Sequence, residues 1–317
     1  MKAYGIGAGV SALIIAATVS VSAEDLTIGY ANQGVAFVFN AAIAKGVQAE
    51  AERLGVHLVE LDAAGDLAKQ SNDIQDLIAQ QVDGVLIGAV DSTAAMGFVD
   101  KVAEAGIPIV AVATQVGDPS TRAQDDVYEN LVALVTQNEV AAGETAGRLA
   151  GKLVPGGGKI AIIEGITGTA QVELRARNFV PAAAEEGAAF EVVTRQPANW
   201  NQEKAFGVCQ NILQANTGLT LIYAQNDPMA IGCAKAAKAA GIEVAVIGIG
   251  GSKFGLAAVA ADDIQGTVCY QPETMGALGL RTLVNHVNGT QELSEAFINY
   301  DTPGIDASNL GDCDPQW

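Results

Sequence analysis

Three polar residues that could bind a ligand follow an apolar run in the segment Tyr-Ala-Gln-Asn-Asp-Pro-Met-Ala-Ile-Gly at 223–232. The apolar residues 219–223 predict a buried strand, and Asp227 followed by Pro228 predicts a helix N-cap with proline at the first helical position. Asn226 then lies at the carboxyl end of a strand, the edge at which open parallel α/β sheets bind ligands. Its amide both donates and accepts, which suits a neutral, hydroxyl-bearing ligand better than a phosphate. An ordinary strand-to-helix turn is the alternative interpretation.

The first 23 residues have the features of a secretory signal peptide. Lys2 precedes an apolar segment at 6–21, and Val-Ser-Ala at 21–23 supplies the small residues that signal peptidase requires. No later stretch reaches the roughly 18 apolar residues of a transmembrane helix. We therefore expect cleavage after Ala23 and an exported, soluble mature chain, long enough for two domains of about 100 to 150 residues each.

Charge and cysteine content narrow the function classes. The formal net charge of −19 argues against nucleic acid or an anionic membrane as a partner, because both are bound through clusters of Lys and Arg. Four cysteines are an even set in an exported chain, which favours disulfides. Of the three pairings that four cysteines allow, we predict Cys209–Cys233, on neighbouring helices, and Cys269–Cys313. The cysteine spacings fit no zinc pattern and the two histidines are isolated, so we expect no metal and no cofactor.

Alternating strand and helix patterns run through the mature chain. Apolar positions four residues apart, such as Ile43, Val47 and Ala51, indicate helices packed on a sheet. The repeated strand–helix order predicts parallel sheets covered on both faces. We expect strands at 26–30, 56–61, 85–87, 107–112, 131–135, 159–163, 190–194, 219–223, 244–248 and 264–270. We expect helices over 43–54, 74–78, 99–102, 138–154, 172–186, 202–214, 227–240, 254–261 and 273–287.

Two interruptions divide this pattern. Residues 115–129 are polar and aspartate-rich, and we interpret them as a surface excursion before the chain enters a second domain. The glycines at 156–158 precede a strand rather than a helix and do not fit a phosphate-binding loop. The chain has no nucleophile elbow, and Gly29 and Gly34 do not form a dinucleotide fingerprint. The sequence therefore predicts an α/β protein of two doubly wound lobes that is not an enzyme.

Four segments occur in a recognisable order and spacing. They are Ala-Glu-Arg-Leu-Gly-Val-His-Leu-Val-Glu-Leu-Asp at 51–62, Gly-Ile-Pro-Ile-Val at 106–110, Gly-Ile-Thr-Gly-Thr at 165–169 and Ala-Gln-Asn-Asp at 224–227. Together, after a signal peptide, they resemble the periplasmic sugar-binding proteins related to ribose-binding protein. The resemblance covers nearly the whole mature chain.

This resemblance implies the type I periplasmic binding protein fold, two doubly wound parallel-sheet lobes joined by three crossover strands. The ligand cleft lies between the lobes and closes by hinge motion, as in periplasmic binding proteins generally. The crossovers are expected near Thr136, Val268 and Ala296. The implied lobes are residues 24–136 plus 270–295, and residues 137–269 plus 296–317 with the tail.

The resemblance also places two site residues in the second lobe. The arginine that grips sugar oxygens falls on Arg175, whose planar fork makes bidentate hydrogen bonds. The alternative is a surface helix arginine, with Arg177 as its exposed companion. The aromatic wall falls on Trp200, whose ring can cover the C–H face of a sugar. An ordinary core tryptophan is the alternative, although Asn199 and Asn201 flank this residue.

In the first lobe and at the last crossover, the match to the family pattern leaves choices open. The loop after the first strand assigns Gln33, Phe39 and Asn40 to the site, with Phe37 as a further member, and one of these phenylalanines could equally be core. At the last crossover, the family glutamine corresponds to Tyr270 or Gln271. Asn226, Thr114 and Gly250 complete the predicted ligand-binding set.

Two departures from the family pattern bear on the substrate. Ala113-Thr114 replaces an Asp-Arg pair, and Gly250 replaces an aspartate, so two carboxylates that accept from sugar hydroxyls are missing. A buried cation without a partner is costly, so Glu164, Glu173 or the ligand must compensate Arg175. We predict that the ligand is not an ordinary pentose or hexose but a polyol, a deoxy or modified sugar, or a sugar with an acid group.

The sequence therefore predicts a periplasmic receptor that delivers a small molecule to the permease and ATPase of an ABC importer. We expect a monomer with no nucleic-acid partner. A receptor for a non-carbohydrate solute, or one that docks on a chemoreceptor, is the alternative. A LacI-type regulator shares the fold but carries a DNA-binding helix-turn-helix where this chain has its signal peptide.

Overall fold

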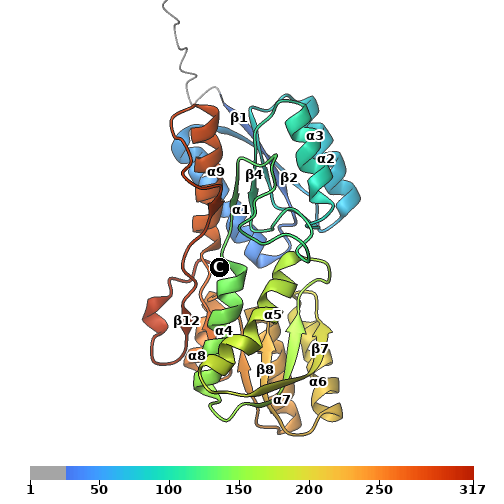
Figure 1. Cartoon of the computed structure of the whole chain (residues 1–317), viewed down its shortest axis with the longest axis vertical. Helices are drawn as coiled ribbons and strands as arrows, with labels where there is room; N and C mark the ends of the chain where they lie inside the picture. Colours follow the sequence, from blue (N-terminus) through green and yellow to red (C-terminus); the bar gives the residue numbers. More distant parts are fainter. Residues whose placement is uncertain (1–25) are drawn as a thin grey trace, which may run out of the picture.

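The computed structural model describes residues 26–317, which form two α/β lobes stacked along the long axis of the molecule (Figure 1). The predicted signal peptide, residues 1–23, and its cleavage site lie outside the described residues. Within residues 26–317, no helix combines the length and the apolar character needed to cross a bilayer.

The first lobe is built from β1 (Thr27–Asn32), α1 (Val38–Leu54), β2 (His57–Asp62), α2 (Leu67–Ala79), β3 (Gly84–Ile87), α3 (Ala95–Glu104), β4 (Ile109–Val112), β5 (Ala133–Val135), α9 (Pro272–Val287) and β11 (Phe297–Ile298). Its parallel sheet has the order β11-β5-β4-β3-β1-β2. Strands β3, β4 and β5 are buried at every residue, as expected where helices cover both faces. Helices α1 and α9 pack on one face, and α2 and α3 pack on the other.

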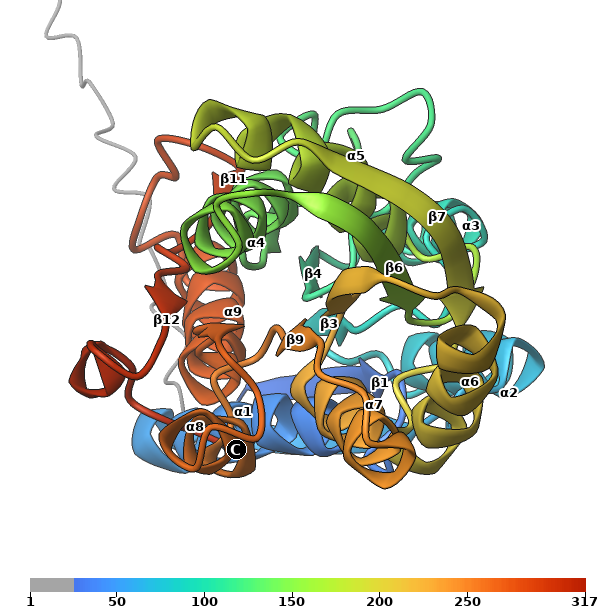
Figure 2. The same cartoon turned by 90° about the horizontal axis from the view of Figure 1, so that it is seen from below.

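The second lobe contains α4 (Glu139–Leu153), β6 (Gly158–Glu164), α5 (Ala170–Glu185), β7 (Phe190–Pro197), α6 (Gln202–Ala215), β8 (Leu219–Ala224), α7 (Asp227–Ala240), β9 (Ala245–Ile247) and α8 (Lys253–Ala260). Its parallel sheet has the order β7-β6-β8-β9. Figure 2 shows α4 and α5 on one side of this sheet and α6 and α7 on the other, each pair over its own buried cluster. The predicted pair of doubly wound lobes is confirmed.

Three chain segments connect the lobes. The first joins β5 to α4, and the second joins β10 (Thr267–Val268) to α9. The third runs from β11 to β12 (Gly304–Ile305), and β12 pairs with β10 in the second lobe. The third crossover thus lies close to the predicted Ala296, but Phe297 and Ile298 pair with β5 and so belong to the first lobe rather than the second. The strand predicted at 264–270 is also shorter than expected, because only two of its residues pair regularly.

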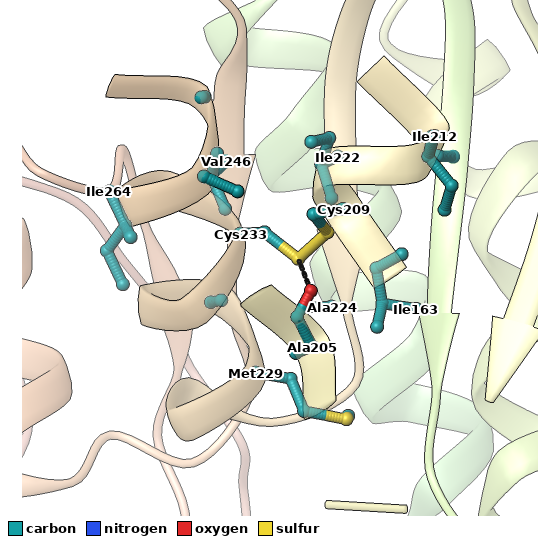
Figure 3. Packing of buried hydrophobic residues seen from close by; sticks show 14 of the residues in the cluster. Ile163, Ala205, Cys209, Ile212, Ile222, Ala224, Met229, Cys233, Val246 and Ile264 are labelled. Atoms are coloured by element: carbon teal, nitrogen blue, oxygen red, sulfur yellow. Dashed lines mark hydrogen bonds between the residues drawn. A yellow bond between two sulfur atoms is a disulfide. The ribbon is translucent and has the colours of Figure 1, made fainter. Parts of the chain in front are cut away.

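Both predicted disulfides are present. Cys209 of α6 is bonded to Cys233 of α7 inside the core of the second lobe, beside Ile222 and Met229 (Figure 3). Cys269, just after β10, is bonded to Cys313, near the end of the sequence. The first bond joins two helices that already pack together, whereas the second attaches the C-terminal segment to a connection between the lobes.

Candidate ligand-binding site

A cavity of about 590 Å³ lies between the lobes and opens at the carboxyl edges of both sheets. Its volume is typical of small-molecule sites. The structure gathers all but one of the predicted ligand-binding residues in its lining: Gln33, Phe37, Phe39, Asn40, Thr114, Arg175, Trp200, Asn226, Gly250 and Tyr270. Gln271 is the exception. It is the N-cap residue of α9, outside the lining, while its neighbour Tyr270 lines the cavity.

The charge of Arg175 is balanced by Glu139, the first residue of α4. Arg175 Nε and Nη2 donate to Glu139 Oε2 and Oε1 at 2.6 and 2.8 Å, and the side chains are only 7% and 2% exposed. Burial by itself lowers the pKa of Arg175, but the charge and hydrogen bonds of Glu139, together with the nearby phenols of Tyr270 and Tyr223, outweigh this effect and raise the pKa above its ordinary value. The interpretation of Arg175 as a surface arginine is therefore wrong, whereas Arg177 is exposed.

Neither carboxylate proposed as the partner of Arg175 contacts it. Glu164 and Glu173 both bind Arg195, which is on β7 and half-exposed. Sequence reasoning missed Glu139 because it lies 36 positions before Arg175. The Glu139 carboxylate accepts hydrogen bonds from three cavity-lining residues, Arg175, Tyr270 and Gln137.

Further donors fix the Glu139 carboxylate. Gln137 Nε2 donates to Oε1 at 2.6 Å, and the Tyr270 hydroxyl donates to Oε2 at 2.8 Å. Burial raises the pKa of Tyr270, which keeps the phenol protonated as a donor. Gln124 accepts from the backbone N–H of Glu139 and donates to the Gln137 carbonyl, so the predicted surface excursion at 115–129 includes buried structural residues.

Close packing of α4 on α5 brings Glu139 and Arg175 within hydrogen-bonding distance. A Cβ on Gly143 would lie 2.7 Å from the Arg175 carbonyl oxygen, and a Cβ on Gly147 would lie 2.1 Å from that of Phe179. Glycines four residues apart therefore let the two helix backbones approach closely. The start of α4 then faces the turn of α5 that carries Arg175.

Trp200 covers the cavity from the loop after β7. Trp200 and Asn199 both have left-handed backbone conformations, with φ of 62° and 54°, an unusual geometry for side chains this large. Asn226 Nδ2 holds the loop by donating to the Trp200 carbonyl at 3.1 Å. The indole is half-buried, packs partly against the second-lobe core and lies with its ring centre 5.6 Å from the Arg175 guanidinium carbon. Part of the Trp200 ring thus packs as a core residue would, and part of it lines the cavity.

Asn226, rather than Asp227, is the N-cap of α7. Its Oδ1 accepts from Met229 N at 2.8 Å, so the prediction that Asp227 caps the helix was wrong. Asp227 is fully buried and accepts from Ser252 N, Ser252 Oγ and Thr267 Oγ1, which ties α7 to α8 and β10. The carboxylate predicted to cap one helix instead joins three elements behind the cavity.

Several lining residues escaped sequence reasoning. Trp317 is the most distant in sequence from the rest of the site, and its Nε1 donates to the Gly250 carbonyl at 3.0 Å. Gln171 lines the cavity with a buried side-chain oxygen that has no partner among the described residues. The remaining unpredicted lining residues are Ala36, Val38, Ala113, Gln137, Asn199, Asn201, Gln202, Gln225, Pro228, Ile249 and Phe254.

The cavity lining combines apolar surface with polar groups and is electrically balanced. Arg175 is the only charged residue in the lining, and the buried Glu139 behind it cancels its charge. The other polar groups are amides and hydroxyls, set among six aromatic rings. Within residues 26–317, no group of three or more His, Cys, Asp and Glu side chains is arranged to hold a metal ion. Such a lining can hydrogen-bond and stack on a neutral ligand.

The family model described as "Periplasmic binding protein domain" matches residues 28–291. The chain belongs to this family. The ribose import binding protein of Escherichia coli (strain K12) is 32% identical over 276 residues, which cover 86% of this chain and 89% of the relative. The D-allose-binding periplasmic protein of the same organism is 33% identical over 247 residues, covering 76% and 78%.

A solved structure agrees with these relatives. The myo-inositol binding protein of Caulobacter, bound to myo-inositol, superimposes with a TM-score of 0.81 at 26% identity and covers 93% of this chain and 98% of that one. The predicted membership among type I periplasmic sugar-binding proteins of ABC transporters is thereby confirmed. Members of this family are binding proteins of transporters and are exported to the periplasm.

Proposed function

We propose that this periplasmic binding protein takes a neutral sugar or sugar-like polyol into the cleft and presents it, as a monomer, to the permease and ATPase of an ABC importer. It acts after removal of residues 1–23 and without catalysis. The Arg175–Glu139 pair carries the proposal, because it leaves the binding cavity without net charge. The relatives whose names include ribose and D-allose, and the structure bound to myo-inositol, support the same ligand class.

The hydrogen-bonding capacity of Arg175 fits ligand oxygens. A guanidinium group has five N–H donors. Three of them bind Glu139 and the Gln225 carbonyl, the latter at 2.8 Å, which leaves two for a ligand. Because Glu139 already neutralises the cation, the ligand needs no acid group. This removes the acidic sugar from the predicted alternatives and retains a polyol or a deoxy or modified sugar.

A thermal-shift screen of mature protein against sugars, polyols, sugar acids and other solutes tests this proposal. Ligand at 100 times its Kd stabilises the folded state by about 2.7 kcal/mol. We expect a neutral carbohydrate or polyol among the hits, with calorimetric binding lost in Trp200→Ala and kept in Arg195→Ala, whose side chain lies outside the cavity. Hits only among acids or non-carbohydrates would contradict the ligand class, whereas tight binding of plain ribose or galactose would contradict the narrower prediction of a polyol or a deoxy or modified sugar.

As an alternative function, the ligand-bound protein docks on a chemoreceptor instead of a permease. Both partners would recognise the ligand-bound arrangement of the lobes. Ligand-dependent pull-down with the purified permease, compared with a chemoreceptor periplasmic domain, separates the two.

A further inference from the structure

The C-terminal segment returns to the cleft and is attached there at two points. Strand β12 pairs with β10, and eight residues after β12 the Cys313 side chain is bonded to Cys269. Cys269, Cys313, Ile305 and Leu256 form a small buried apolar cluster. The segment is therefore anchored covalently and by packing just before its last residues reach the cavity.

The last two residues contact both lobes. Gln316 exchanges two hydrogen bonds with Thr274, at the start of α9 in the first lobe, at 3.0 and 2.7 Å. The Trp317 carbonyl accepts from Lys253 N at 2.8 Å in the second lobe. The Trp317 ring packs edge-on against Phe39 of the first lobe, with ring centres 5.3 Å apart, and against Phe254 of the second at 5.7 Å. The indole thus lies where the two lobes meet over the cavity.

Two consecutive glycines after β9 make room for this segment. Gly250 has φ of 145°, and a Cβ there would lie 2.4 Å from the Trp317 ring. Gly251 has φ of 58°, and its Cβ would lie 2.6 Å from the Cys313 sulfur. Any larger residue at 250 would collide with the indole. The position where the family resemblance implies an aspartate is therefore filled by the side chain of Trp317.

This replacement changes the chemistry of one corner of the cavity. The single N–H of the indole is already bonded to the Gly250 carbonyl, and indole nitrogen accepts no hydrogen bond. The neighbouring lining residues Phe39, Phe254 and Ile249 are apolar. Arg175, Gln137 and Gln225 are among the polar residues of the lining. A ligand hydroxyl buried against the indole corner would lose its water without gaining a partner, which is unfavourable.

We propose that Trp317, placed by the Cys269–Cys313 disulfide, is a ligand-contacting residue that selects a sugar or cyclic polyol with hydrogen or methyl in place of hydroxyl at this corner. The inference rests on the proposed function and deepens it by naming the deoxygenated substrate class. It assigns a binding role to a segment that sequence reasoning had treated as a tail.

The first test needs no ligand. The chain has two tryptophans, so Trp200→Phe leaves Trp317 as the only indole. Its emission should be shifted to short wavelength and protected from acrylamide. Adding Cys269→Ser and Cys313→Ser should move the emission to that of a solvated indole. The matched control adds Cys209→Ser and Cys233→Ser, which removes the core disulfide and should leave the emission unchanged. A solvated spectrum in Trp200→Phe alone would overturn the placement of Trp317.

The second test compares matched sugars by calorimetry on the full mature chain. The pairs are D-ribose with 2-deoxy-D-ribose, D-allose with 6-deoxy-D-allose, and D-galactose with D-fucose. For the skeleton that binds, we expect the deoxy member to bind about tenfold tighter or more, a typical discrimination for one group in a pocket. Trp317→Ala should reduce that ratio to near one.

The outcomes separate the two proposals. Preference for the hydroxyl member, or a preference that persists in Trp317→Ala, would overturn the role of Trp317 while the receptor function stands. Binding of no sugar, polyol or deoxy sugar by either protein would overturn the proposed function and the ligand class together, although the fluorescence result would still locate Trp317.

Discussion

Arg175 and Glu139 form a buried two-point ion pair beside the cavity, although they lie on different helices of the second lobe. The pair is fixed by the close glycine-mediated packing of α4 on α5. Removing one partner leaves an uncompensated buried charge, whereas removing an exposed partner is nearly neutral. The stability of this lobe therefore depends on the same residues that set the charge of the cavity.

Replacing Arg175 by Ala should lower the free energy of unfolding by about 3 kcal/mol or more, because Glu139 would remain buried and unpaired. The matched control is Arg195→Ala, which also removes an arginine bound to two carboxylate oxygens, but at a half-exposed site. That change should cost about 1 kcal/mol or less. Urea unfolding followed by circular dichroism measures both. Equal losses in the two variants would contradict the buried-pair argument.

Gly165→Ala should weaken ligand binding by displacing Trp200. A Cβ at this position would lie 1.8 Å from the indole, so the ring must move from its place over the cavity. Loss of one aromatic contact with the ligand corresponds to about a tenfold increase in Kd, measured by calorimetry. Gly207→Ala in α6 is the control, because a Cβ there meets nothing within 4 Å. An unchanged Kd in Gly165→Ala would show that the ring position does not matter.

Ser92→Ala should weaken ligand binding by loosening the closed arrangement. Ser92 Oγ of the first lobe accepts from Ala170 N at 3.3 Å, at the start of helix α5, where Thr169 makes no side-chain cap. Hinge opening would break this bond, so its loss penalises only the closed form. A missing cap corresponds to about 0.5 to 2 kcal/mol of binding free energy, measured by calorimetry. The exposed Thr93 supplies the control, Thr93→Ala, with no expected change. A lower Tm of the ligand-free Ser92→Ala protein, without weaker binding, would refute the prediction.

Glu50→Gln should remove part of the acid sensitivity of the first lobe. Hydrogen bonds from Arg53, and also from Arg281 on α9, hold the pKa of Glu50 at about 2, below its ordinary value of 4.5. A lowered pKa in the folded state stabilises above pH 4.5, and this contribution is lost as pH falls toward 2. The Tm of wild type should therefore fall more steeply than that of Glu50→Gln over this range. The exposed Glu52 on the same helix gives the control, Glu52→Gln, which should follow wild type.

Local sequence patterns located much of the cleft because ligand residues follow strand ends. Asn226 after β8 lies where alternating strands and helices predict the carboxyl edge of a sheet, Trp200 after β7 was assigned from the family resemblance, and both line the cavity. Where the family pattern allowed two adjacent residues, the sequence could not choose. Tyr270 lines the cavity, whereas Gln271 occupies the N-cap position of α9 outside the lining.

Long-range pairings were outside the reach of these patterns. The partner of Arg175 could not be chosen from nearby acids, since Glu164 and Glu173 are closer in sequence yet turn to Arg195. The choice of Glu139 depends on how closely two helices pack, which only the assembled lobe determines. Trp317 was missed for a similar reason: its position follows from a disulfide and from empty space above Gly250.

The attachment of the C-terminal segment through Cys269–Cys313 also gives the site an order of biogenesis. Reducing compartments oppose disulfide formation, whereas the periplasm promotes it. A newly synthesised chain that has not been exported lacks the covalent anchor for Trp317, and its cleft is incomplete on one side. Under the proposed function, completion of the binding site then follows translocation, and a chain that has not been exported binds its solute less tightly.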